Sequence, residues 1–312
     1  MNKKVVCVGT VILDCVVRGF DPVPISETGY KAESTGLFPG GEALNQAVTL
    51  SKLGMEPRIV CGAGFDSASV ILIDELERYH VDLQYLIRHE EMASPVTVMF
   101  IDGEGGRKSI TNNAHRYNIR PDIDLSYLDG AAALSLGSLF RAPFDDPEII
   151  YKVVSAAKDR GIPVYADTKI PNFRKLSLYD IKDSLPLIDF ITPNEQEAAY
   201  FTGKTEPEEC ADEFLSMGVK NVIIKLGPDG CLLKNADGCI RLPAEKVKAV
   251  DATGAGDNFL AGFITARALG NDLSYSLRFA NICGGICSTM PGAATALKGT
   301  EQVISFMQKI PQ

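Results

Sequence analysis

The residues best suited to chemistry form a glycine-rich turn at positions 251–257, with the sequence Asp-Ala-Thr-Gly-Ala-Gly-Asp. A segment of apolar, helix-like spacing, 258–269, follows it directly. The N-terminus of a helix presents unpaired N–H groups and a partial positive charge, and the small residues 254–256 leave an anion room to reach them. A carboxylate beside such a site, that of Asp257, is suited to take a proton from a hydroxyl that attacks a phosphoryl group.

The residues alone leave other interpretations of this turn open. Aspartate is a preferred N-cap residue, so Asp257 could simply cap the helix that follows. No Gly-Lys-Ser/Thr sequence follows the turn, so it is not a Walker A loop. The other Gly-x-Gly sequence, at Gly62 and Gly64, lacks the rest of a dinucleotide fingerprint, which disfavours a dinucleotide-dependent dehydrogenase.

Composition restricts the partners. The chain has 312 residues and a formal net charge of −9, whereas a protein that binds nucleic-acid phosphates or anionic membranes needs a basic face. A nucleotide is not excluded, because a few amides and one lysine can hold it. The eight cysteines are scattered without a Cys-x-x-Cys sequence, which favours reduced thiols, and no segment resembles a targeting signal or a membrane span. We expect a soluble, cytoplasmic protein with neither nucleic-acid nor membrane partners.

Short β-rich runs alternate with segments of helical spacing along most of the chain. The expected strands are 5–9, 58–61, 132–136, 164–166, 190–192 and 222–226. The expected helices are 42–53, 67–79, 147–160, 194–201, 258–269, 274–287 and 301–309. This alternation predicts an α/β architecture, in which helices cover both faces of a parallel sheet, and no composition break divides residues 1–312 into separate domains.

Two stretches, 13–38 and 95–113, depart from the alternation. They carry β-type residues interrupted by glycine, proline and polar residues, without a helix of useful length. They predict a small sheet that projects from the body as a lid and excludes water from a transfer site; surface hairpins without a role are the alternative. Because an exposed sheet edge seeks a partner, the lid also predicts a homodimer formed through it.

Two motifs carry a resemblance to a known family. The turn at 251–257, followed by Phe259, Ala261 and Gly262, closely resembles the C-terminal signature of the ribokinase-like, or PfkB, family of carbohydrate kinases. The sequence Gly-Gly-Glu-Ala-Leu-Asn-Gln-Ala at 40–47 resembles its N-terminal signature. The resemblance implies a three-layer ribokinase-like fold, with a mostly parallel central sheet flanked by helices and a small β-sheet lid.

The resemblance also implies an activity, the transfer of the γ-phosphate of ATP to a primary hydroxyl of a small carbohydrate in the presence of Mg²⁺. By the same resemblance Asp257 is the base, and the anion hole is formed by the amides of Gly254, Ala255, Gly256 and Asp257. The residues implied to bind the substrate are Asp14, Gly40, Gly41, Asn45, Asn113 and Asp167.

Further positions resemble the family's nucleotide and metal sites. The residues implied to contact ATP are Asn194, Lys225, Gly227, Gly230 and Asn281, and Glu197 is implied to bind Mg²⁺ through water. A helix-capping pattern explains Asn194 and Glu197 equally well. Asp251 and Thr253 resemble ligands of an activating monovalent cation, K⁺, in a site that backbone oxygens around Ser288–Gly292 would complete.

The substrate stays open within this reading. The Gly-Gly-Glu-Ala-Leu-Asn form resembles hexose, keto-sugar and sugar-acid members more than ribokinase itself, with a pentose among the candidates. The alternatives are a nucleoside kinase of the adenosine, inosine or pseudouridine type and a catalytically silent sugar-binding regulator. Lys169 and Arg174 either face an anionic group of the substrate or pair with an acid of the protein.

Overall fold

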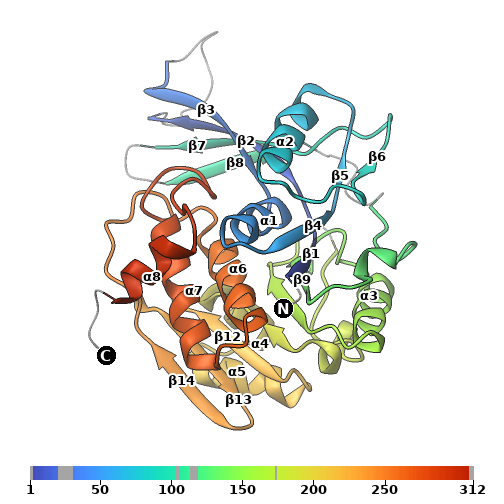
Figure 1. Ribbon diagram of the computed structural model, residues 1–312, viewed down its shortest axis with the longest axis vertical. Helices are drawn as coiled ribbons and strands as arrows, with labels where there is room; N and C mark the ends of the chain where they lie inside the picture. Colours follow the sequence, from blue (N-terminus) through green and yellow to red (C-terminus); the bar gives the residue numbers. More distant parts are fainter. Residues whose placement is uncertain (1–2, 20–30, 103–105, 113–118, 173, 309–312) are drawn as a thin grey trace.

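An eight-stranded sheet forms the centre of the molecule. The computed structural model describes residues 3–19, 31–102, 106–112, 119–172 and 174–308 (Figure 1). The strand order is β14-β13-β12-β11-β10-β9-β1-β4, and the pairs from β4 to β12 are parallel whereas β12–β13 and β13–β14 are antiparallel. The strands are β1 (Lys4–Val8), β4 (Glu56–Val60), β9 (Ala133–Leu139), β10 (Val164–Thr168), β11 (Phe190–Ile191), β12 (Asn221–Lys225), β13 (Cys231–Asn235) and β14 (Gly238–Leu242).

Helices cover both faces of this sheet because its parallel strands are apolar on both sides. In β1, Val5 and Cys7 pack into one core, and Val6 and Val8 pack into the other. The first core includes α1 (Glu42–Lys52), α2 (Ser67–Arg78), α6 (Ala255–Ala268) and α7 (Leu273–Cys287), and the second includes α3 (Pro147–Asp159), α4 (Glu195–Thr202) and α5 (Pro207–Ser216). A last helix, α8 (Thr300–Gln308), lies beside α7 (Figure 1).

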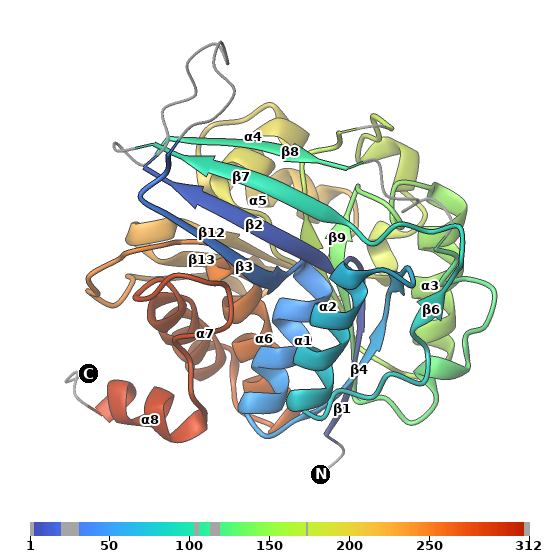
Figure 2. The same ribbon diagram turned by 90° about the horizontal axis from the view of Figure 1, so that it is seen from above.

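A second, four-stranded sheet lies across one end of the body, at the top of Figure 1 and seen from above in Figure 2. Its order is β3-β2-β7-β8, with β2–β7 parallel and the outer pairs antiparallel. The strands are β2 (Ile12–Arg18), β3 (Ser34–Gly40), β7 (Val96–Ile101) and β8 (Arg107–Thr111), and a separate two-stranded sheet pairs β5 (Gly62–Ala63) with β6 (Ile87–Arg88). These strands come from the two stretches expected to form a lid; that the sheet acts as a lid stays a prediction.

The expected three-layer α/β architecture is confirmed, and the departures from it are local. Helix α6 begins at Ala255 rather than at residue 258, so Asp257 lies inside its first turn and Gly254 is the N-cap. The antiparallel strands β13 and β14 and helix α5 were not expected. In the part of the chain that the structure describes, no helix has the length and apolar character needed to span a membrane.

Candidate active site

The N-terminus of α6 is shaped to accept an anion. Gly254 has φ of 78°, and a Cβ there would lie 2.4 Å from the Cβ of Ala293, so only glycine fits. A Cβ at Gly256 would lie 3.2 Å from Nζ of Lys225, which places an ammonium group beside the first turn of the helix. The N–H of Ala255 donates to the carbonyl of Ala252 at 3.2 Å, whereas the following helix N-terminal amides lie beside the lysine and suit the negatively charged oxygens of a phosphoryl group.

Asp257 is almost fully buried beside these amides, with 7% of its surface exposed. Asn45 Nδ2 donates a hydrogen bond of 2.8 Å to Oδ2, and Gln46 Nε2 lies 3.5 Å from Oδ1. Burial raises the pKa of Asp257 to about 7; Lys169 opposes this rise, and Glu42 adds to it. A carboxylate with this pKa is suited to exchange a proton near neutral pH.

Gln46 was not among the expected site residues. Asn45 contacts Asp257, and its expected contact with the substrate stays a prediction. Both residues lie on α1 and orient the carboxylate of Asp257. Gln46 is itself held by Ser135, whose Oγ donates to Oε1 at 2.6 Å. The sequence offered one indication that Gln46 belongs to the site: it directly follows Asn45 in the N-terminal motif.

Asp167 departs from its expected role. It was expected to bind the substrate, but its side chain is completely buried and has no surface to offer a small molecule. Lys225 Nζ lies 2.5 Å from Oδ1, Thr192 Oγ1 donates to the same oxygen at 3.1 Å, and Lys169 Nζ lies 3.6 Å from Oδ2. Burial acts to raise the pKa of Asp167, but the two lysines outweigh it and hold the pKa below its ordinary value. Asp167 therefore fixes the lysines that flank the anion site.

Lys169 and Arg174, whose role the sequence left open, both pair with acidic side chains of the protein. Lys169 lies against Asp167, with 25% of its side chain exposed. Burial lowers the pKa of Lys169, but surrounding carboxylates, led by that of Asp167, raise it well above its ordinary value, so the group is charged at neutral pH. Arg174 donates to Asp146 at 2.9 Å on the surface.

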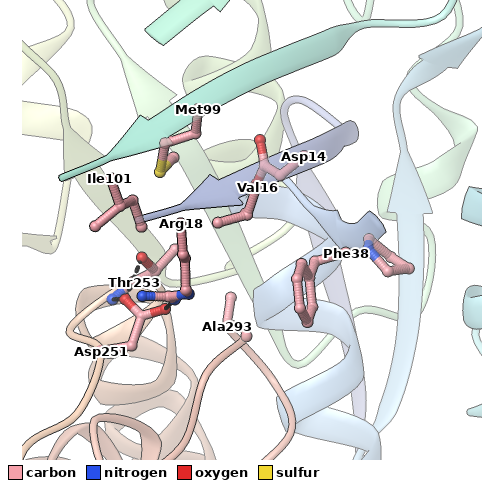
Figure 3. Close-up of a pocket in the computed structure, with 11 residues that line it drawn as sticks. Asp14, Val16, Arg18, Phe38, Met99, Ile101, Asp251, Thr253 and Ala293 are labelled. Carbon is pink, nitrogen blue, oxygen red and sulfur yellow. Dashed lines mark hydrogen bonds and ion pairs between the residues drawn. The ribbon is translucent and has the colours of Figure 1, made fainter. Parts of the chain in front are cut away.

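Asp14 lines a small hollow beneath the four-stranded sheet (Figure 3). Burial, with a smaller contribution from Glu42, raises the pKa of Asp14 to about 6. A Cβ at Gly40 would lie 2.7 Å from Asp14 Oδ2, and a Cβ at Gly41, where φ is 93°, would lie 2.6 Å from the carbonyl oxygen of Thr10. The absence of side chains at Gly40 and Gly41 thus allows the carboxylate of Asp14 and the backbone of Thr10 to approach the N-terminus of α1.

Asn194 and Glu197 form the capping box that was the alternative to a metal site. Asn194 Oδ1 accepts from the backbone N–H of Glu197, and Glu197 Oε2 accepts from the N–H of Asn194, both at 2.9 Å. Thr168 Oγ1 donates to the same Oε2 at 3.0 Å. Across the described residues, no cluster of three or more His, Cys, Asp or Glu side chains could hold a metal ion by itself. The role of Glu197 toward Mg²⁺ stays a prediction.

The remaining residues expected to contact ATP lie around the end of β12, and their contact with the nucleotide stays a prediction. Gly227 has φ of 55° and Gly230 has φ of 96°, and a Cβ at Gly230 would lie 2.0 Å from the carbonyl oxygen of Leu242. These glycines therefore shape the turn that follows Lys225. Asn281 on α7 donates to the carbonyl of Pro243 at 3.3 Å. Asn113 lies outside the described residues.

Asp251 and Thr253 lie together, but in company with an arginine that was not expected. Thr253 donates to Asp251 Oδ1 through its N–H at 3.0 Å and through Oγ1 at 2.6 Å. Arg18 on β2 donates to Asp251 Oδ2 at 3.0 Å. Strand alternation could have predicted that Arg18 lies near Asp14, because alternate residues of a strand share one face. Asp14, Val16 and Arg18 do line the same hollow (Figure 3).

Comparisons with known proteins point to one family. A family model described as pfkB family carbohydrate kinase matches residues 2–299. The ribokinase of Staphylococcus aureus (strain COL) is 25% identical over 316 residues, which cover 97% of this chain and 99% of that protein. The probable fructokinase-5 of Arabidopsis thaliana is 26% identical, over 89% of this chain and 91% of that protein.

The fold is shared as well. The structure of Arabidopsis thaliana ribokinase complexed with ribose and ATP has a TM-score of 0.85 and 26% identity, with 99% of each chain covered. The family model spans nearly the whole chain, so the predicted membership of this family is confirmed; the two signature motifs meet at Asp257. The chain belongs to the pfkB family of carbohydrate kinases.

Proposed function

We propose that this protein is an ATP-dependent sugar kinase that transfers the γ-phosphate to a primary hydroxyl of a small neutral carbohydrate. The observation that carries the proposal is the position of Asp257, a buried carboxylate in the first turn of α6, beside an anion site flanked by Lys225. A base and an anion hole that meet at one point are what in-line phosphoryl transfer requires.

Each group then has one role in the transfer. The sugar hydroxyl oxygen attacks the γ-phosphorus, its proton passes to the carboxylate of Asp257, and the bond to the β–γ bridging oxygen breaks so that ADP leaves with the electron pair. The amides of residues 254–257 and the ammonium of Lys225 stabilise the charge of the migrating group. Mg²⁺ bound with the nucleotide near Glu197 would neutralise phosphate charge.

The charges around the site favour a neutral sugar over a sugar acid. Asp14 lines the hollow, and Glu42 is close enough to both Asp14 and Asp257 to raise their pKa values. The nearby cations Arg18 and Lys169 are each paired with an aspartate of the protein. A carboxylate acceptor matches the hydroxyl donors of a sugar and repels an anionic substrate.

The relatives include both ribokinases and fructokinases, so they do not indicate whether the substrate is a pentose or a hexose. A substrate screen distinguishes the two. The screen measures ATP consumption with Mg²⁺ over pentoses, aldohexoses, ketohexoses, sugar acids and nucleosides, with Asp257→Asn as the inactive control. We expect the highest kcat/KM for a neutral sugar, and a sugar acid about tenfold or more below it. A sugar acid or a nucleoside as the best substrate would contradict the proposal, as would the absence of any phosphorylated product.

We also propose that the protein acts in the cytoplasm, with the four-stranded sheet as its lid. The eight cysteines are unpaired, which suits a reducing compartment. The sheet lies over the hollow that Asp14 lines, so a substrate bound there would be shielded from water (Figure 3).

A further inference from the structure

The ion pair between Arg18 and Asp251 joins the lid sheet to the loop that leads into the anion site. The two residues are 233 positions apart in the chain, and their closest nitrogen and oxygen atoms lie 3.0 Å apart. Asp251 exposes 6% of its side chain and Arg18 exposes 29%. Figure 3 shows the guanidinium of Arg18 extending from β2 to this carboxylate.

The carboxylate of Asp251 organises the loop on its other side. Its Oδ1 accepts two hydrogen bonds from Thr253, and the next residue, Gly254, is the N-cap of α6. The conformation that presents the amides of the anion hole therefore depends on the carboxyl group of Asp251. An ionised carboxylate buried to this degree needs a positive charge nearby.

A monovalent cation is a poor fit for that positive charge in this protein. Both oxygens of Asp251 already accept hydrogen bonds, and the guanidinium of Arg18 would repel a cation at the same carboxylate. The nearby carbonyls are engaged too: that of Ser288 accepts from the N–H groups of Val250 and Asp251, at 2.7 and 3.1 Å.

Two more carbonyls of this region are engaged in the same way. The carbonyl of Ala293 accepts from Asn258 Nδ2 at 2.7 Å and from Cys287 Sγ at 3.1 Å. The carbonyl of Thr253 accepts from Cys287 Sγ at 3.4 Å. These three carbonyl oxygens therefore already accept hydrogen bonds from donors of the protein itself, and together with the ion pair of Asp251 they make the residues present a poor match for the expected K⁺ site.

We propose that Arg18 is the built-in cation of this loop, so that the lid strand supplies the positive charge that K⁺ was expected to supply. Arg18 is a positioning residue, because it acts through Asp251 and Thr253 on the anion hole and touches neither reacting group. Lid closure and order in the 251–254 loop are then coupled, since the guanidinium reaches Asp251 only from β2 over the site. This inference rests on the proposed kinase function.

The test compares phosphorylation rates of the wild type and Arg18→Gln in buffers whose only monovalent cation is potassium, sodium or tris. We expect wild-type rates to agree within about twofold, because the arginine satisfies the carboxylate. For Arg18→Gln we expect kcat in tris to fall about tenfold or more and to recover with potassium, which can approach the uncovered carboxylate. Arg18→Lys keeps the charge and should stay independent of potassium.

Thermal melting gives a readout that does not depend on finding the substrate. Potassium should raise the Tm of Arg18→Gln above its value in tris and leave that of the wild type unchanged. Lys108→Gln, which removes an exposed positive charge from β8, is the control and should behave as the wild type does. If the wild type phosphorylates no sugar, the proposed function fails. The melting data still show whether Arg18 supplies the positive charge that Asp251 needs.

Two results would overturn the inference. One is a wild-type enzyme whose rate or Tm rises strongly with potassium over tris, because Asp251 would then still need an external cation. The other is an Arg18→Gln variant as fast and as stable in tris as the wild type, because the guanidinium would then have no positioning role.

Discussion

The charged site in the body and the four-stranded sheet above it are built in opposite ways. In the body, Asp167 and Asp257 are buried, and each is held by more than one side chain. In the sheet, Leu37 and Ile110 expose 54% and 68% of their surface, and the sheet joins the 251–254 loop through the ion pair of Arg18.

This difference separates two tasks. Buried charges must have partners, so these two carboxylates of the body are held in place before any substrate arrives. A sheet with one face open to solvent can move as a unit. Its side chains then contribute to the site only when the sheet closes over the body. Variants in the two regions should therefore differ in their effects on rate and stability.

Asp257→Asn should have the largest effect. We expect kcat to fall by about 10²–10⁴-fold, because the general base is lost while the amide keeps the shape of the site. Asp272→Asn, at the N-cap of α7, is the matched control and should keep wild-type activity. An Asp257→Asn enzyme that keeps the wild-type rate would contradict the mechanism.

The same variant should also change stability with pH. The pKa of Asp257 is about 7 in the folded protein, above its ordinary value of 3.8, so the folded state retains a proton that the unfolded state releases. The wild type therefore loses stability as pH rises through this window, and Asp257→Asn should melt higher than the wild type at pH 8 and nearly equally at pH 4. An equal Tm at both pH values would argue against a buried, charged carboxylate.

Lys225→Met should come next, with kcat lower by about 10²–10³-fold, because a positive charge beside the anion hole is lost. Its Tm should also fall, since Asp167 keeps a buried charge without its closest partner. Adding Asp167→Asn should restore the Tm and leave the rate low. Lys234→Met on β13 is the control; recovery of rate in the double variant would show that Lys225 is only structural.

Gly254→Ala should reduce both activity and stability, because the added Cβ meets Ala293 at 2.4 Å. Gly270→Ala is the matched control: its φ of 85° is similarly unfavourable for alanine, but no atom lies within 4 Å of the added Cβ. We expect the control to lose about 1–2 kcal/mol of stability at unchanged kcat, and Gly254→Ala to lose more, with a slower phosphoryl transfer. Equal kcat in both variants would argue against the anion hole.

The smallest effect on rate is expected from the outer face of the lid. Leu37, Cys15, Val98 and Ile110 share one register row across the four strands, and the two outermost are exposed. We propose a homodimer through this sheet, so Leu37→Lys with Ile110→Lys should give a monomer in light scattering at nearly unchanged kcat. Ile304→Lys on α8 is the control; a wild-type monomer at micromolar concentration would contradict the dimer.

The fold was largely predictable because its signals are local. The alternation of apolar strands and helices predicts the parallel sheet. The glycine turn predicts that a helix begins near it, although not the exact residue at which α6 starts. The hairpin of β13 and β14 and the short helix α5 lack such signals: β14 is mostly exposed, and α5 carries four acidic residues among its ten.

The site was only partly predictable because its pairings are long-range. The two motifs locate Asp257 and Asn45, but not the hydrogen bond between them, which spans 212 positions. The pairs of Arg18 with Asp251 and of Asp167 with Lys225 depend on how the sheets meet, and nothing in either local sequence specifies the partner. Asp167 was assigned to the substrate by resemblance to the family, and its complete burial depends on packing that its local sequence does not show.

The most direct test of this account is the pH dependence of kcat/KM for the wild type and Asp257→Asn with the best sugar. The account predicts that the wild-type value falls about tenfold per pH unit below a pKa of about 7, whereas the low activity of Asp257→Asn lacks this limb. The same acidic limb in Asp257→Asn would assign the proton to another group, and the assignment of Asp257 as the base would be wrong.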